Sequence, residues 1–198
     1  MGEAKRRSKQ IAFTNIVNQF VADRMRVNRY GGDIGVVPTH KIRRDNTGRK
    51  NACIDNAGQH INNIVGPAVG WLLAHRISDN IVECVPHMWN INFKTGQYFD
   101  TTPFDSRFYD LYSNFAYVWD SDMYMHYCEN QDTIENYLPG IAYIQNGKYY
   151  NVLDMDPFTG SALHVEEMTD LDIANFSWDY IYDDGVSKDS IVNLFKNA

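Results

Sequence analysis

The chain has 198 residues, of which 44% are hydrophobic and 14% aromatic, and its formal net charge is −7. This length and composition predict a folded protein of one domain with a substantial buried core. No stretch reaches the ~18–20 uninterrupted apolar residues of a membrane span, and the start MGEAKRRSKQ lacks the apolar run of a signal peptide, so we expect a cytoplasmic protein.

Charge is divided unevenly along the chain. Residues 1–50 hold 12 Lys and Arg against 4 Asp and Glu, whereas residues 51–198 hold 6 against 21. The basic part can contact nucleic acid or an acidic partner, or it can be a solvated helix beside an acidic body. The acidic body argues against nucleic acid as the main ligand, because phosphate contacts require clustered Lys and Arg.

The basic part is predicted to contain one long helix. Apolar residues between Phe13 and Met25 recur at spacings of three and four, which indicates an amphipathic helix over residues 9–28. Residues 30–50, with a glycine pair and Pro38, are expected to be irregular. We therefore expect residues 1–50 to pack as a helix and an irregular segment on a body formed by residues 51–198.

A second helix is predicted directly after Cys53. Its apolar positions run from Ile54 to Ile64 at helical spacing, and Gly66-Pro67 is its expected stop signal. Cys53 is then placed at the first turn of this helix.

The chain beyond this helix is predicted to consist mainly of strands. Aromatic and branched residues separated by turn residues indicate strands at 71–73, 81–82, 87–93, 97–101 and in a hairpin over 141–152 with an Asn-Gly turn. Residues 104–137 have no clear period and receive no assignment. A short helix is expected at 187–198, and the acidic aromatic stretch 176–184 is expected to be a solvated strand or a partner-binding surface.

The chain has three cysteines, Cys53, Cys84 and Cys128. An odd number without a CxxC spacing predicts neither a disulfide framework nor a zinc ribbon, so free thiols are expected. Cys84 and Cys128 are interpreted as buried, small apolar residues.

Cys53, His87 and Asp100 follow one another in the order thiol, base and acid. A cysteine protease or acyltransferase needs a thiolate, an imidazole that accepts its proton, and an acceptor that fixes the imidazole tautomer. The amides at a helix N-terminus favour a thiolate and can also bind the oxyanion of a tetrahedral intermediate.

The segment around these residues resembles the transglutaminase-like superfamily of papain-like cysteine enzymes. The matching features are Cys53 before a helix, His87-Met-Trp-Asn, the turn residue Gly96, and Tyr-Phe-Asp100-Thr-Thr-Pro. The resemblance covers residues 50–103. It implies an α+β fold in which a helix bearing the cysteine packs on an antiparallel sheet bearing the histidine and the aspartate.

The resemblance also implies a function. Cys53 would attack an amide carbonyl, His87 would act as base and then as acid, and Asp100 would orient His87. The expected activity is that of an amide-bond hydrolase or acyltransferase on a protein or peptide, without a cofactor. Trp89 belongs either to the core or to a substrate pocket beside the thiol. Two alternatives stay open: a catalytically silent binding module of the same fold, and a nucleic-acid-associated protein that uses the basic segment.

The turn between His87 and Asp100 decides whether the two side chains can meet. A tight turn at Thr95-Gly96 would leave them four residues apart along the strands, ~13 Å. A wider loop centred on Phe93-Lys94 would place them directly opposite each other. Both registers keep the two side chains on one face of the sheet.

Asp120, Asp122, His126 and Cys128 form a loose group of metal-ligating residue types. Their spacing is not that of a known zinc site, and such groups are common on acidic loops, so we expect no metal. The chain also lacks a P-loop, a GxGxxG motif and a nucleophile-elbow serine.

Overall fold

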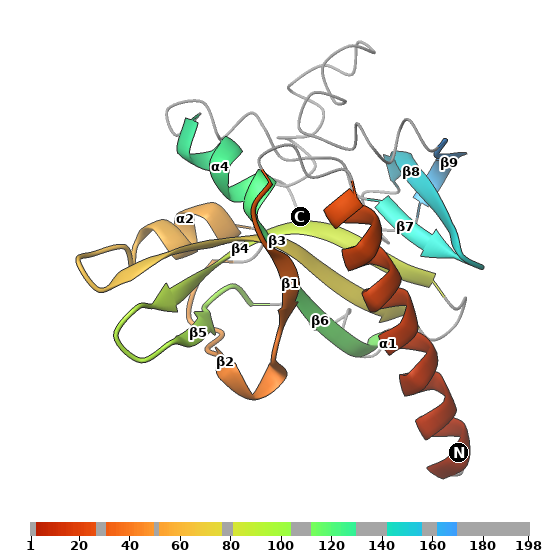
Figure 1. Ribbon diagram of the computed structural model, residues 1–198, viewed down its shortest axis with the longest axis horizontal. Helices are drawn as coiled ribbons and strands as arrows, with labels where there is room; N and C mark the ends of the chain where they lie inside the picture. The colour runs from red at the N-terminus through yellow and green to blue at the C-terminus, as the bar shows by residue number, and fades with distance from the viewer. Residues whose placement is uncertain are drawn as a thin grey trace.

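The computed structural model describes residues 3–26, 31–49, 52–76, 81–103, 112–129, 142–155 and 162–169 (Figure 1). Its elements, in chain order, are α1 Glu3–Arg26, β1 Ile34–Val37, the 3-10 turn η1 Thr39–Lys41, β2 Ile42–Arg44, α2 Cys53–Gly58, β3 Val65–Arg76, β4 Ile81–Asn92, β5 Gln97–Asp100, β6 Tyr112–Asp120, α4 Ser121–Glu129, β7 Ala142–Gln145, β8 Lys148–Met155 and β9 Ala162–Glu167.

These strands form one mixed sheet in the order β1-β6-β3-β4-β7-β8-β9, and β5 pairs with both β4 and β2. The pairing is antiparallel except between β2 and β5, which run parallel. The predicted α+β class with a mostly antiparallel sheet is confirmed. No helix among the described residues is long and apolar enough to cross a membrane.

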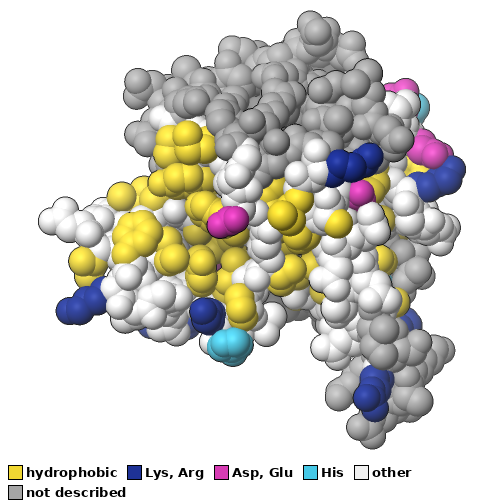
Figure 2. Space-filling view, in the orientation of Figure 1, with side chains coloured by type: hydrophobic (Ala, Val, Ile, Leu, Met, Phe, Trp, Pro, Cys, Tyr) yellow, Lys and Arg dark blue, Asp and Glu magenta, His cyan; other side chains and the backbone are white. Residues whose placement is uncertain are grey.

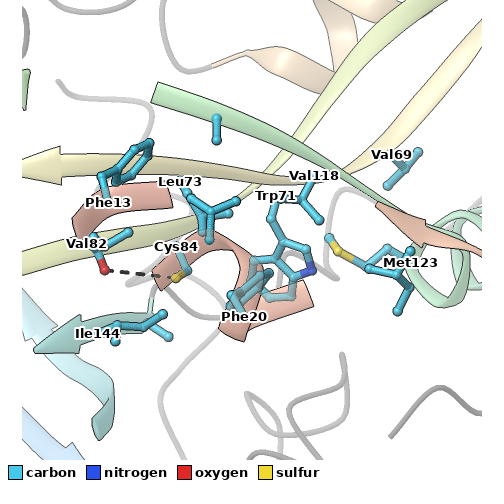
Figure 3. Close-up of a cluster of buried hydrophobic side chains, with 14 of the residues drawn as sticks. Phe13, Phe20, Val69, Trp71, Leu73, Val82, Cys84, Val118, Met123 and Ile144 are labelled. Atoms are coloured by element: carbon cyan, nitrogen blue, oxygen red, sulfur yellow. Dashed lines mark hydrogen bonds between the residues drawn. The ribbon is translucent and has the colours of Figure 1, made fainter. Parts of the chain in front are cut away.

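Helix α1 packs on one face of the sheet, as its apolar spacing predicted, and it begins earlier than expected (Figure 1). Phe13 and Phe20 lie against the central strands, where they meet Trp71, Leu73 and Cys84 (Figure 3). Burying each aromatic ring contributes roughly 1.5–3 kcal/mol, which is ample to hold the helix in place. Figure 2 shows apolar side chains gathered in the middle of one face, with Lys and Arg toward its edges.

A buried ion pair anchors the end of α1. Arg24 donates from Nε to Asp120 Oδ2 at 2.9 Å, and Trp71 Nε1 donates to the same oxygen at 2.8 Å. The other oxygen of Asp120 accepts the backbone N–H of Asp122 at 3.0 Å, at the start of α4. One carboxylate therefore joins α1, the sheet and α4, a role that the sequence did not indicate.

Two predictions about the first third of the chain are wrong. The segment 30–50, expected to be irregular, contributes β1 and β2 to the sheet. Helix α2 ends at Gly58, and Gly66-Pro67 lies inside β3 instead of stopping a helix. Pro67 is tolerated because β6 pairs with β3 only from Gly70 onward, so the strand edge beside Pro67 needs no amide donor.

Later predictions are mostly confirmed where the structure describes the chain. The β7–β8 hairpin turns at Asn146 and Gly147, with φ of 52° and 78°, as a primed turn requires. The unassigned stretch 104–137 contains β6 and α4. The expected helix at 187–198 and the acidic stretch 176–184 lie outside the described residues.

Candidate functional site

The candidate site lies beside β4, in the gap between the two strands, β7 and β5, that share one edge of β4. Along one edge β4 pairs continuously with β3. Along the other edge residues 81–84 pair with β7, and residues 90–92 pair with β5. Within the described residues, no strand pairs with positions 85–89 on that edge. His87 is at the centre of this interval, so a group from a neighbouring helix can approach it there.

The β4–β5 register differs from both registers considered for the sequence. Asn92 pairs with Gln97 and Asn90 with Phe99, which leaves a four-residue loop at 93–96. Continued by one pair, this register places Asp100 opposite Trp89, so that His87 is the diagonal neighbour of Asp100. Diagonal neighbours lie ≈ 7–8 Å apart at the backbone, which long side chains can bridge.

The diagonal pair is in hydrogen-bond contact. His87 Nε2 lies 2.9 Å from Asp100 Oδ2, and the two side chains are 6% and 1% exposed. Tyr117, from β6, donates its hydroxyl to the same Asp100 oxygen at 2.6 Å. The backbone N–H of Thr102 donates to Asp100 Oδ1 at 2.9 Å. Asp100 thus accepts three hydrogen bonds in a buried position.

These contacts set the protonation of the pair. Burial raises the pKa of Asp100, but the charge and hydrogen bond of His87 and the donors Tyr117 and Thr102 outweigh it, so that the pKa is lowered to about 2. Burial lowers the pKa of His87, but Asp100 and a smaller contribution from Cys53 outweigh it and raise the pKa to about 10. The site therefore favours an imidazolium beside a carboxylate at neutral pH.

Cys53, at the start of α2, completes the group. It is the first residue of α2 and is half-buried, and it lies close enough to His87 to raise the pKa of the imidazole. Since His87 Nε2 is bonded to Asp100, the nitrogen left to face the thiol is Nδ1. Helix α2 has only six residues, so the dipole available at Cys53 is smaller than the expected longer helix would have supplied.

Two asparagines hold α2 against the strands. Asn90 donates from Nδ2 to the carbonyl of Ala57 at 3.0 Å. Asn56 donates from Nδ2 to Thr102 Oγ1 at 3.2 Å and accepts the backbone N–H of Arg49 at 2.8 Å. The helix bearing the thiol is therefore tied both to the strand of His87 and to the chain that follows Asp100.

Trp89 lies in the core next to the site. It is 1% exposed, stacks on His87 with 6.1 Å between ring centroids, and meets Tyr117 edge-on at 5.2 Å. Its indole Nε1 has no hydrogen-bond partner among the described residues. Of the two readings of Trp89 offered by the sequence, these contacts favour the core, where the ring fixes the plane of the imidazole.

The other two thiols are placed differently. Cys84 is fully buried in the core, and burial strongly raises the pKa of its thiol. Burial is therefore confirmed for Cys84, whereas the predicted burial of Cys128 is wrong, because Cys128 is exposed on α4. Within the described part of the chain, no three His, Cys, Asp or Glu side chains come together as a metal site would require.

Sequence reasoning selected Cys53, His87 and Asp100, and the structure brings these three together. It missed Tyr117, which lies in a stretch without a period, and nothing in the sequence pattern marks that tyrosine. It treated Asn90 as structural and did not foresee its bond to α2. Comparisons with known proteins name no family, because no protein-family model, curated protein or solved structure matches the chain.

Proposed function

We propose that the protein is a cysteine-dependent amide-bond hydrolase or acyltransferase that works through a thioester on Cys53. The observation that carries the proposal is the imidazole of His87, whose Nε2 lies 2.9 Å from Asp100 Oδ2, while Cys53 at the start of α2 is close enough to raise the pKa of the same ring. A nucleophile within reach of a base, and a base held by a third group, is the arrangement that nucleophilic catalysis requires.

In the proposed first step, the Cys53 sulfur bonds to the carbonyl carbon of an amide. The carbon–nitrogen bond then breaks, and the His87 imidazolium gives its proton to the leaving amine. In the second step water or another amine attacks the thioester while His87 takes a proton from it. The carbon–sulfur bond breaks, and the thiolate and the imidazolium are restored.

The remaining contacts support this cycle. Asp100 keeps Nε2 of His87 engaged, so Nδ1 is the nitrogen that moves the proton. Asn90 and Asn56 tie α2 to β4 and to the chain after Asp100, which limits the movement of the thiol relative to the imidazole. Positioning of this kind is a large part of the rate that enzymes gain.

A cysteine at the start of a helix, with histidine and aspartate on adjacent strands, is also the basis on which we propose a papain-like, transglutaminase-like arrangement. The proposed substrates are proteins or peptides, and the acceptor of the acyl group is water or an amine. Incubating the protein with a peptide substrate and a fluorescent primary amine separates the two outcomes, because only transfer labels the product.

The first test of the proposal is the reactivity of Cys53 toward iodoacetamide at pH 5–6, followed residue by residue by mass spectrometry. A thiolate paired with an imidazolium must react at least about tenfold faster than Cys128, which is exposed and serves as the internal control. His87→Gln must abolish the difference. If Cys53 reacts no faster than Cys128 in the unmodified protein, the proposed activation is wrong.

A further inference from the structure

We propose that Tyr117 is a positioning residue that keeps Asp100 free of a proton throughout the reaction cycle. The proposal rests on the function proposed above, which requires His87 to alternate between its charged and neutral forms.

Tyr117 is in direct hydrogen-bond contact with Asp100, the carboxylate that holds His87. Its hydroxyl donates to Asp100 Oδ2 at 2.6 Å, the same oxygen that His87 Nε2 contacts at 2.9 Å. Tyr117 is 4% exposed, and its ring is held edge-on against Trp89 and at 5.9 Å from the His87 ring. The packing of the ring therefore holds the hydroxyl in position to donate to Asp100.

The need for this donor arises when His87 is neutral. Asp100 is 1% exposed, and a buried carboxylate without a cation tends to take up a proton. A proton on Oδ2 would make that oxygen a donor toward His87 Nε2, and the imidazole would then lose the tautomer that the reaction uses. The hydroxyl of Tyr117 and the amide of Thr102 stabilise the charged carboxylate at that moment.

The other groups around Asp100 do not replace this contact. Arg44, its partner in the β2–β5 register, donates from Nη2 to the carbonyl of Thr102 at 3.1 Å. Asp45 contributes its backbone N–H, which bonds to the carbonyl of Asp100 and not to its carboxylate. Cys53 influences the pKa of His87, whereas the pKa of Asp100 is set by burial, His87, Tyr117 and Thr102. Tyr117 is thus the side-chain hydroxyl that faces the carboxylate among these neighbours.

Tyr117→Phe tests the proposal because it removes the hydroxyl and keeps the ring. The direct readout is the carboxyl carbon resonance of Asp100, followed against pH by NMR in protein labelled with ¹³C-aspartate and assigned with Asp100→Asn. Loss of one hydrogen bond to the charged form must raise the midpoint of this titration by about one to two pH units. The acid limit of kcat must move by the same amount, with KM nearly unchanged.

Tyr143→Phe is the matched control. Tyr143 is also buried in the sheet, but it stacks on Tyr150 and does not contact Asp100, so its variant must leave the Asp100 midpoint where it is. An unchanged midpoint in Tyr117→Phe overturns the proposal. A raised midpoint in a protein that turns over no amide supports the positioning role and refutes the proposed function, so the two failures are distinguishable.

A second measurement covers the case in which Tyr117→Phe does not fold. Biosynthetic 3-fluorotyrosine is a stronger donor than tyrosine, because its phenol is more acidic, and it must shift the Asp100 midpoint downward. A midpoint that stays constant or rises under fluorotyrosine labelling overturns the proposal.

Discussion

Replacing Asp100 with asparagine perturbs the site with the least change in shape. The carboxylate is 1% exposed and accepts hydrogen bonds from His87, Tyr117 and Thr102. Asparagine fills the same volume but carries no charge, and its amide nitrogen can only donate. Asp100→Asn therefore removes the counter-ion of His87. Its amide nitrogen, which can only donate, would also face at least one of the groups that now donate to Asp100.

The expected destabilisation is large because the pair is buried. Removing one partner of a buried ion pair costs on the order of 3–5 kcal/mol, since the other partner stays in the interior uncompensated. For a chain of 198 residues, each kcal/mol lowers the melting temperature by roughly 2–4 °C, so we expect a decrease of roughly 6–20 °C.

The destabilisation must also depend on pH in a defined direction. The pKa of Asp100 is lowered to about 2 in the folded protein, so its contribution is present above ~3.9 and is lost as the pH falls toward 2. The pKa of His87 is raised to about 10, so its contribution is present below ~6.5 and is lost as the pH rises toward 10. The difference between wild type and Asp100→Asn must therefore be largest between about pH 4 and 6.5.

Urea unfolding at pH 5.5, 7.5 and 9.5, followed by tryptophan fluorescence, measures this difference. Asp45→Asn is the matched control, since the Asp45 side chain is 41% exposed and lies 3.9 Å from Arg43, and an exposed pair contributes about 0.2–1 kcal/mol at most. A penalty for Asp100→Asn that is equal at all three pH values, or no larger than that of the control, would refute the reasoning about a buried charged pair.

Two further predictions concern the fold. Gly70→Ala must destabilise the protein by more than about 3 kcal/mol in urea unfolding, because the added Cβ would lie 2.0 Å from a backbone oxygen of β6. Gly35→Ala is the control: its Cβ would meet nothing within 4 Å, so it must change stability by less than about 1 kcal/mol. Asp120→Ala removes the fully buried carboxylate that accepts from Arg24 and must cost about 3–5 kcal/mol in the same assay, while Glu167→Ala, in an exposed ion pair, must cost less than about 1 kcal/mol. Equal losses within either pair of variants would contradict the corresponding argument.

The parts of the fold that local chemistry determines were predictable from the sequence. The apolar spacing from Phe13 onward marked α1, and Asn146-Gly147 marked the second hairpin, because each signal lies within one short segment. The helix predicted to run to Ile64 failed for a local reason as well. Ile61 and Ile64 have helical spacing, yet they are 44% and 49% exposed on the turn before β3, so periodicity alone misplaced them.

The residues of the candidate site could be selected from the sequence, but their geometry could not. The order of Cys53, His87 and Asp100 suggested the chemistry, whereas their meeting depends on a register between the two that were considered. Tyr117 could not be found, because it reaches Asp100 through the placement of β6 beside β3, which is a contact between segments distant in sequence. Long-range pairing of this kind leaves no local pattern.

The same contacts that build the site also hold this corner of the fold together. The backbone carbonyl of Asp100 accepts the N–H of Asp45, that of Thr101 accepts the N–H of Gly48, and Asn56 links the same loop to α2. Substitutions at Asp100 or Asn56 therefore reduce stability and site geometry together, and a loss of activity in them cannot by itself assign a chemical role. Cys53→Ala differs, because Cys53 is only partly buried against the core and accepts none of these backbone bonds. A variant that keeps full stability while losing all amide turnover would separate chemistry from folding. We expect Cys53→Ala to be such a variant.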